Sequence, residues 1–247
     1  MRHYYAHLSK SEVNRMSKNV RSEEILRIVN KKGSISISEL AETIFASRST
    51  IRRDLEKLEN QGLIRRHHGG AESVLALNPP QIIRRQRNQT EKSLIASQAV
   101  ALVTPGSTIF IDASTTVQYM IPHLATIERL TVYTNGADTS MRLAEVRIRS
   151  LCTGGELLSE SMAYVGSIAE SAIRKLYFDA MFFSSAGFDD QVVSDWSETE
   201  TALRRAVMEQ SAKKYFLADH SKRGKHYTHI VCKIHEIDNM ICQRMDL

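Results

Sequence analysis

The chain has 247 residues, of which 42% are hydrophobic and 25% are charged, and its formal net charge is +5. No apolar run approaches the roughly 18 residues needed to span a bilayer, and the N-terminus lacks the apolar core of a signal peptide. Composition therefore predicts a cytoplasmic protein with no membrane partner. The three cysteines lie in apolar, strand-like contexts, which favours reduced core thiols over disulfides.

The charge is divided unevenly along the chain. Residues 1–88 contain 17 Lys and Arg against 9 Asp and Glu, whereas residues 89–247 contain 16 against 19. A positive excess confined to the N-terminal part is typical of a protein that binds a polyanion such as nucleic acid.

Four segments are expected from these patterns and from the length of the chain. Residues 1–19 are polar and basic without an apolar run, so we expect a disordered N-terminal extension. A winged helix-turn-helix domain is expected over residues 20–76, a linker over 77–90, and an effector-binding and oligomerisation domain over 91–247. The linker contains prolines, which stop helices and strands, and three arginines that either touch DNA or are merely solvated.

The third helix of the expected winged domain carries the most informative pattern. Ile51, Leu55 and Leu58 recur at spacings of four and three, so they share one face and pack inward. Ser47 is expected to cap the N-terminus of this helix with its hydroxyl. Arginines fall on the opposite face, at the end of a helix-turn-helix that enters a major groove.

A basic wing is expected after this helix, over residues 63–74, with Gly69 and Gly70 in its tight turn. Double-stranded operator DNA is the expected partner, because capping, core spacing, basic helix face and basic wing all agree. The alternatives are a solvated arginine-rich face, or a module that binds protein or RNA. The candidate DNA contacts are Ser47, Arg48, Ser49, Thr50, Arg52, Arg53, Lys57, Arg65, Arg66, His67 and His68.

Strands and helices alternate in the second half of the chain. Strands are expected at 108–111, 130–133, 148–152, 180–184, 215–217, 229–232 and 240–242, and helices at 92–102, 117–124, 167–176 and 199–212. This alternation predicts an α/β domain with a mostly parallel sheet that helices cover on both faces.

Polar residues follow five of these strands, where ligands lie in sheets of this kind. The hydroxyls of Ser114, Thr115 and Thr116 and the charge of Lys222 favour a phosphate. Aspartates accept hydrogen bonds from sugar hydroxyls. The alternative is that these loops are self-stabilising Asx and Ser/Thr turns, and Asp179 is left open between the two interpretations. The candidate effector residues are Asp112, Ser114, Thr115, Thr116, Thr134, Asn135, Gly154, Gly155, Gly187, Asp189, Asp219 and Lys222.

Several runs resemble one known family. They are Thr50-Ile-Arg-Arg-Asp-Leu55, His68-Gly-Gly-Ala71, Phe110-Ile-Asp-Ala-Ser-Thr-Thr116 and Ala218-Asp-His-Ser-Lys222. Together they resemble the DeoR family of bacterial transcriptional regulators over essentially everything after residue 20. The resemblance implies a repressor of carbohydrate metabolism, controlled by a phosphorylated sugar and without a cofactor. A homodimer or homotetramer is expected because winged-helix regulators read paired half-sites, and the apolar edges Ile230-Val231 and Met240-Ile-Cys242 offer contact surface. The resemblance also implies a sensor domain similar in fold to ribose-5-phosphate isomerase.

That similarity raises an alternative function, a sugar-phosphate isomerase-like enzyme. Residues 193–205 lack the lysine and the glycines of the isomerase turn, and an arginine occupies the position expected for the glutamate base. Glu198 and Glu200 remain nearby, but nothing in the sequence holds a base within reach of a substrate proton. We therefore expect no enzyme activity. A protein-interaction scaffold is the third alternative.

A possible metal motif, His226, His229, Cys232 and His235, repeats every third residue. The segment is predicted as a strand, in which a spacing of three sends side chains to opposite faces. No metal site is expected.

Overall fold

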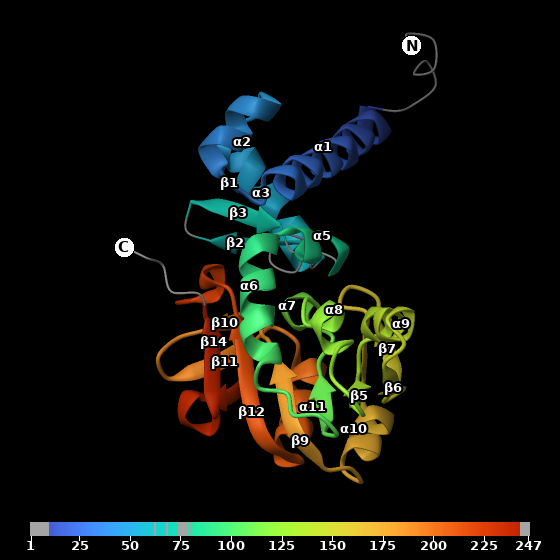
Figure 1. Ribbon diagram of the computed structural model, residues 1–247. Helices are drawn as coiled ribbons and strands as arrows, with labels where there is room; N and C mark the ends of the chain where they lie inside the picture. Colours follow the sequence, from blue (N-terminus) through green and yellow to red (C-terminus); the bar gives the residue numbers. More distant parts are fainter. Residues whose placement is uncertain (1–9, 62, 68, 74–78, 80, 243–247) are drawn as a thin grey trace. The chain divides into compact units, whose positions relative to one another are not determined.

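The computed structural model describes residues 10–61, 63–67, 69–73, 79 and 81–242, and it divides between Pro79 and Pro80 into two compact units (Figure 1). We call residues 1–79 the N-terminal unit and residues 80–247 the C-terminal unit, and each is considered by itself. The division falls within the linker that the sequence predicts over residues 77–90. Helix α5 (Gln81–Gln86) and the start of α6 (Gln89–Val100) occupy the described rest of that segment.

The N-terminal unit is the predicted winged helix-turn-helix. Its elements are α1 (Lys10–Lys32), β1 (Ser34–Ser36), α2 (Ile37–Ile44), α3 (Arg48–Asn60), β2 (Ile64–His67) and β3 (Gly70–Ser73). The three strands form an antiparallel sheet in the order β1-β3-β2, in which β2 and β3 are the wing.

One small core holds this unit together. Ile51, Leu55 and Leu58 of α3 are buried, as their spacing predicts, against residues of α1 and α2. Asp54 is buried on the same helix and forms an ion pair with Arg21 of α1, at 2.6 Å between Oδ2 and Nε. This pair links α1 to α3 beside the apolar contacts.

Helix α1 begins ten residues before the expected start of the domain. The sequence predicts disorder over residues 1–19, but residues 10–19 are helical and residues 1–9 lie outside the described part. Neither glycine nor proline interrupts the run from Lys10 to Lys32, so nothing in it stops the helix from continuing toward the N-terminus.

The C-terminal unit is the predicted α/β domain. After α5 and α6 its first half contains β4 (Thr108–Ile111), α7 (Thr115–Gln118), α8 (Ile121–Leu124), β5 (Thr131–Thr134), α9 (Ala137–Glu145), β6 (Arg149–Cys152), β7 (Glu156–Leu158) and β8 (Ala163–Val165). Its second half contains α10 (Ser167–Ile173), β9 (Phe178–Phe183), β10 (Gly187–Phe188), β11 (Val192–Asp195), α11 (Glu198–Glu209), β12 (Ser211–Ala218), η1 (His220–Lys222), β13 (His229–Lys233), η2 (Ile234–Glu236) and β14 (Asn239–Cys242).

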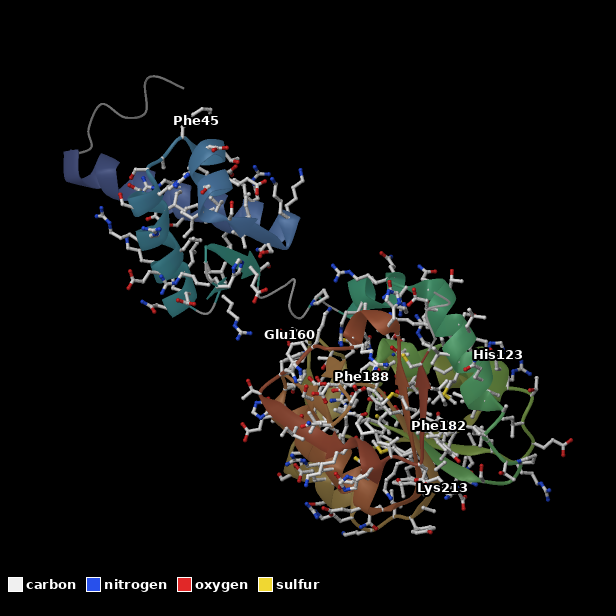
Figure 2. All side chains as sticks on the ribbon, turned by 90° about the vertical axis from the view of Figure 1, so that its left-hand side faces the viewer. Phe45, His123, Glu160, Phe182, Phe188 and Lys213 are labelled. Atoms are coloured by element: carbon white, nitrogen blue, oxygen red, sulfur yellow. The ribbon has the colours of Figure 1, made fainter. Side chains whose placement is uncertain are left out.

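Six strands form the central parallel sheet, in the order β14-β12-β9-β4-β5-β6. Neighbouring residues of one strand point to opposite faces, so the sheet supplies two apolar cores. Phe182 packs on the face covered by α6 to α9, and Phe183 packs on the face covered by α10 and α11. Figure 2 shows Phe182 and Phe188 inside this unit, whereas Lys213 and His123 lie at its surface. The predicted two-faced α/β fold is thereby confirmed.

Two predicted elements differ from the structure. Strand β13 pairs with β11 in a separate antiparallel sheet, ordered β10-β11-β13, and does not join the central sheet. The helix expected over 117–124 is two short helices, because Pro122 at the start of α8 has no N–H for a continuous ladder.

The three cysteines are free thiols in different settings. Cys232 is buried, but Cys152 is exposed on the edge strand β6, so the expectation of a core thiol is wrong for Cys152. Within the described residues, every helix is too short or too polar to cross a membrane.

Candidate nucleic-acid interface and ligand site

A set of hydroxyl groups fixes the beginning of α3. The side chain of Ser47 accepts a hydrogen bond from the amide of Thr50 at 3.2 Å, which is the predicted N-cap. The hydroxyls of Ser49 and Thr50 each lie 2.9 Å from the hydroxyl of Ser47. The first turn of the helix therefore presents an ordered group of donors and acceptors.

The basic face of α3 lies where the sequence predicts it. Four cationic side chains are exposed on the side opposite the buried leucines, namely those of Arg48, Arg52, Arg53 and Lys57. In a helix-turn-helix this face enters the major groove, and its arginines have the geometry for bidentate contacts with guanine.

The wing is attached to α3 by one of its predicted DNA contacts. Arg66 donates to Glu59 twice, from its amide at 2.9 Å and from its Nε at 2.5 Å, and these bonds lower the pKa of the Glu59 carboxyl. Arg65 is exposed. The ring of His67 lies 3.3 Å from the hydroxyl of Ser34, and His68 lies outside the described residues. The sequence did not reveal that Arg66 joins the wing to the helix.

In the C-terminal unit, residues that follow β4, β5, β9 and β12 meet at one rim of the sheet because these strands are parallel. Asp112 follows β4 and is buried. Its Oδ1 accepts from the amide of Ser114 at 3.0 Å, and its Oδ2 accepts from the amide of Ser184 at 3.2 Å and from Arg204 at 3.1 Å. The carboxylate thus organises the rim rather than standing free for a sugar hydroxyl.

Arg204 of α11 lies at the centre of three buried carboxylates. It pairs with Asp112 at 3.1 Å, with Asp195 at 3.0 Å and with Glu200 at 3.1 Å. Burial lowers the pKa of the guanidinium, but the surrounding carboxylates outweigh burial and raise it above its ordinary value. Burial also raises the pKa of Glu200. This network occupies the segment in which an isomerase-like enzyme would need its base.

Two lysines approach the adjacent threonines at the start of α7. Lys222 donates to the hydroxyls of Ser184 at 2.7 Å and Thr116 at 3.2 Å. These two hydroxyls hold the ammonium, so it is not the mobile charge that the sequence suggests, and burial lowers its pKa. Lys92 of α6 donates to the hydroxyl of Thr115 at 3.1 Å. Burial, and then the charge of Lys222, lower the pKa of Lys92 to about 8.

A third cation comes from α5. Lys92 donates to the carbonyl oxygen of Arg84, and the Nε of Arg84 is buried without a hydrogen-bond partner among the described residues. Burial lowers the pKa of Arg84, and the carboxylate of Glu200 acts in the opposite direction. Arg84, Lys92 and Lys222 therefore form a cationic cluster that is partly removed from water. From the sequence alone, Arg84 was either a DNA contact or a solvated residue of the linker.

Other predicted rim residues hold loops in place. Asn135 accepts from the amide of Ala113 and donates to the carbonyl of Tyr164, both at 3.1 Å, and Thr134 accepts from the amide of Gly136 at 3.0 Å. Asp219 accepts from the side-chain amide of Asn88 at 2.9 Å and from the backbone of its own turn.

Glycines of the predicted site provide backbone shape. Gly154 and Gly155 follow β6 with φ values of 65° and 114°, a region that residues with a Cβ rarely adopt. A Cβ at Gly155 would lie 2.5 Å from the carbonyl oxygen of Val165, and one at Gly187 would collide with the backbone of Lys225.

Two candidate aspartates make backbone contacts elsewhere. Asp189 lies in the turn between β10 and β11, where its Oδ1 accepts from the amides of Gln191 at 2.8 Å and Val192 at 2.7 Å. The Val192 bond is the main cause of the lowered pKa of Asp189. Asp179 accepts from the amide of Thr108 at 2.7 Å, at the amino end of β4 and thus away from the rim.

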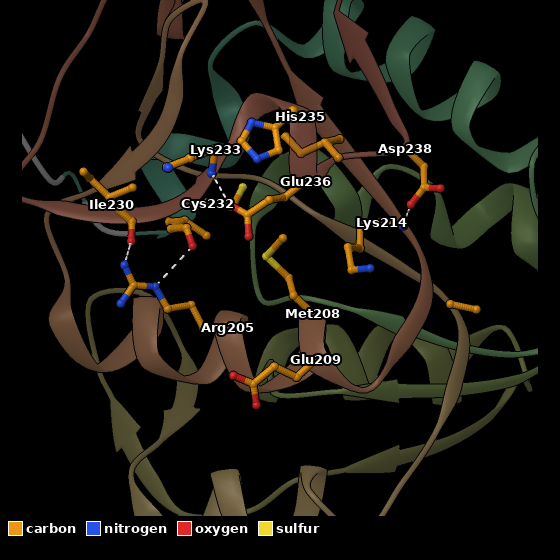
Figure 3. Close-up of a pocket in the computed structure, with 13 residues that line it drawn as sticks. Arg205, Met208, Glu209, Lys214, Ile230, Cys232, Lys233, His235, Glu236 and Asp238 are labelled. Carbon is orange, nitrogen blue, oxygen red and sulfur yellow. Dashed lines mark hydrogen bonds between the residues drawn. The ribbon is translucent and has the colours of Figure 1, made fainter.

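A different cavity, of about 840 Å³, opens between α11, β13 and the beginning of β12 (Figure 3). Arg205 donates to the carbonyl oxygens of Ile230 and Val231 at one side of it, and Lys214 and Asp238 lie at the other. None of the predicted site residues lines it. Within the described residues, no three His, Cys, Asp or Glu side chains are arranged to hold a metal ion.

Comparisons with known proteins agree with both units. Residues 21–75 match the model of the DeoR-like helix-turn-helix domain, and residues 87–244 match that of the DeoR C terminal sensor domain. The lactose phosphotransferase system repressor of Staphylococcus aureus (strain NCTC 8325 / PS 47) is 32% identical over 237 residues, which are 94% of each chain. An uncharacterised HTH-type transcriptional regulator of Bacillus subtilis (strain 168) is 35% identical, over 90% of this chain and 87% of its own.

Matches among solved structures are more distant. A D-ribose-5-phosphate isomerase in complex with phospho-erythronic acid has a TM-score of 0.43 and 11% identity, over 55% of this chain and 54% of its own. The delta subunit of eIF2B from Chaetomium thermophilum has a TM-score of 0.47 and 12% identity, over 97% of this chain and 79% of its own.

A winged helix-turn-helix joined to an α/β sensor domain defines a DNA-binding transcriptional repressor. The chain belongs to the DeoR family.

Proposed function

We propose that α3 and the wing read operator DNA while the C-terminal unit binds a phosphorylated sugar that changes the affinity for that DNA. The observation that carries the second part is the cluster of Arg84, Lys92 and Lys222 beside the hydroxyls of Thr115 and Thr116. A binding protein of this kind acts in the cytoplasm, so cytoplasmic localisation belongs to the same proposal.

The chemistry of the cluster favours an anion. Burial makes the charged form of each cation less favourable, and a phosphate dianion compensates for the lost hydration. Lys92 and Lys222 also repel each other, which an anion between them relieves. The hydroxyl groups nearby provide the hydrogen bonds that a phosphate accepts.

Helix α5 is the element that can link effector binding to the affinity for DNA. Arg84 lies on the short helix that opens the C-terminal unit, directly after the division of the chain at Pro79 and Pro80. An anion held by Arg84 fixes α5 against the rim, where Gln81 already donates to the carbonyl of Ala113 at 2.9 Å. Effector binding and operator binding are then linked reciprocally.

The test combines two measurements on the full chain. Sugar phosphates are screened by thermal shift, because a ligand of the native state raises the apparent stability, and the best one is titrated into an operator complex. Lys222→Ala is expected to lose the response to the effector and to keep effector-free operator affinity. Lys175→Ala, at an exposed lysine just before β9 and thus at the opposite end of the strands from the rim, is the matched control and should respond normally. A normal response of Lys222→Ala contradicts the assignment.

We infer that the protein is not an isomerase, since Arg204 pairs with three of the buried carboxylates of the rim. Asp219 is also buried there, and it accepts hydrogen bonds from Asn88 and from its own turn. A base must be free to take a proton from substrate carbon. Incubation with pentose phosphates is expected to give no turnover above the buffer, and measurable turnover that Glu200→Gln abolishes would overturn this inference.

We also propose that the protein is a homodimer or homotetramer. Winged helix-turn-helix regulators read paired half-sites through symmetric assemblies. Of the apolar edges that the sequence offers for contact, Val231 and Ile241 are buried in the core, whereas the side chain of Ile230 on β13 is 45% exposed. Ile230 is therefore the candidate for a contact surface in the C-terminal unit.

A further inference from the structure

The turn between α2 and α3 contains an aromatic residue in an unusual setting. Phe45 caps α2 in the left-handed region, with φ 55° and ψ 43°, and its amide donates to the carbonyls of Ala41 and Glu42. Glycine or asparagine is the ordinary residue at such a cap, because other side chains are strained there. The ring of Phe45 is 97% exposed and projects from the N-terminal unit (Figure 2).

The fold of the N-terminal unit does not explain this ring. The core formed by α1, α2, α3 and the wing includes Ile44 and Ala46 on either side of Phe45, but not Phe45 itself. A residue that is strained in its backbone and surrounded by water is favoured by something outside the unit.

The position of Phe45 indicates what that partner is. It lies two residues before Ser47, the N-cap of α3, at the helix end that enters a major groove. The exposed Arg48 and Arg52 begin the basic face on the same helix, so the ring is continuous with a surface of the charge that DNA requires.

We propose that Phe45 packs against a thymine methyl group of the operator, at the edge of the major groove that α3 enters. The thymine methyl is the apolar feature of that groove, and aromatic side chains contact it. Phe45 then adds an apolar preference for thymine to the polar contacts of α3. This inference rests on the proposed DNA-binding surface of α3.

The test uses Phe45→Asn in the full chain, because asparagine accepts the left-handed conformation. The variant should melt at the same temperature as the parent protein or higher, while its operator affinity falls about tenfold. Its salt dependence should be unchanged, because no charge is removed. Tyr177→Asn removes another exposed aromatic ring, in the C-terminal unit, and should leave operator affinity unchanged.

Operators with uracil in place of single thymines identify the contact. The parent protein should bind one such operator about fourfold more weakly, as expected for the loss of one buried methyl group, and Phe45→Asn should bind both operators equally. Equal sensitivity of the two proteins to uracil, unchanged affinity of Phe45→Asn, or a change in its oligomeric state would each overturn the proposal.

Arg52→Ala distinguishes a failure of the proposed DNA-binding surface of α3 from a failure of the role of Phe45. If it binds the operator normally, the α3 surface itself is wrong; if it binds weakly while Phe45→Asn is silent, only the role of Phe45 is wrong.

Discussion

At the scale of single residues, the ligand site depends on a lysine that the sequence argument overlooked. Lys92 lies three residues before Ile95 and so shares the inward face of α6, which the apolar periodicity alone predicts. A lysine on an inward face indicates a buried partner or a function. The apolar members of this face predict the helix, whereas the partners of the lysine lie far away in the sequence and are fixed by the fold.

The lowered pKa of Lys92 predicts how stability depends on pH. Its pKa is about 8 in the folded chain and ordinarily 10.5. Between these values the unfolded chain keeps a proton that the folded chain has released, so the free energy of unfolding rises with pH. Denaturant unfolding at several pH values should show this rise in the parent protein. Lys92→Met should show a smaller rise, because the lowered pKa of Lys222 contributes in the same direction.

The same pKa predicts how effector affinity depends on pH. A phosphate bound beside the Lys92 ammonium is held best while that group is charged, so its affinity should fall as pH rises above about 8. Lys92→Arg keeps the charge and should show a smaller fall, to which only Lys222 still contributes. If isothermal titration finds parallel pH profiles for the two proteins, Lys92 does not contact the phosphate.

At the scale of elements, the wing and α3 behave as one piece because Arg66 joins β2 to Glu59. Arg65→Ala should leave the melting temperature unchanged, weaken binding to all DNA sequences alike and reduce the salt slope by about one. Arg66→Ala should weaken binding and also lower the melting temperature, since it removes a bond between two elements.

Glu59→Gln separates the two effects, because it keeps the size of the side chain but removes its charge. It should lower the melting temperature as Arg66→Ala does, while Arg66 is released and DNA affinity is kept or raised. Identical melting temperatures for Arg65→Ala and Arg66→Ala would show that the ion pair has no structural role.

At the scale of the whole molecule, assembly decides how two half-sites are read. Ile230→Asp places a charge on the exposed apolar part of β13 and should shift sedimentation of the full chain toward the monomer. Operator affinity should fall with it, because a monomer reads one half-site. Tyr177→Asp, on an exposed loop, is the control. A parent protein that sediments as a monomer at micromolar concentration would contradict the proposed oligomer.

The sequence by itself determined the two units, the inner face of α3 and the order along the chain of the six strands of the central sheet. These features depend on residue spacing: Ile51, Leu55 and Leu58 give a helix face, and short apolar runs between polar turns give strands. Such features depend only on residues that lie close together in the sequence. The N-cap at Ser47 was predictable for the same reason.

Only the tertiary structure decided what the polar residues do. Asp112 and Asp189 look alike in the sequence, yet one meets Arg204, which lies 92 positions away, and the other closes a turn with its neighbours. Lys222 meets Thr116 because parallel strands bring separate loops to one rim, and Lys92 reaches the adjacent Thr115 from α6. Contacts between distant residues depend on the packing of the whole sheet, and no local pattern carries that information.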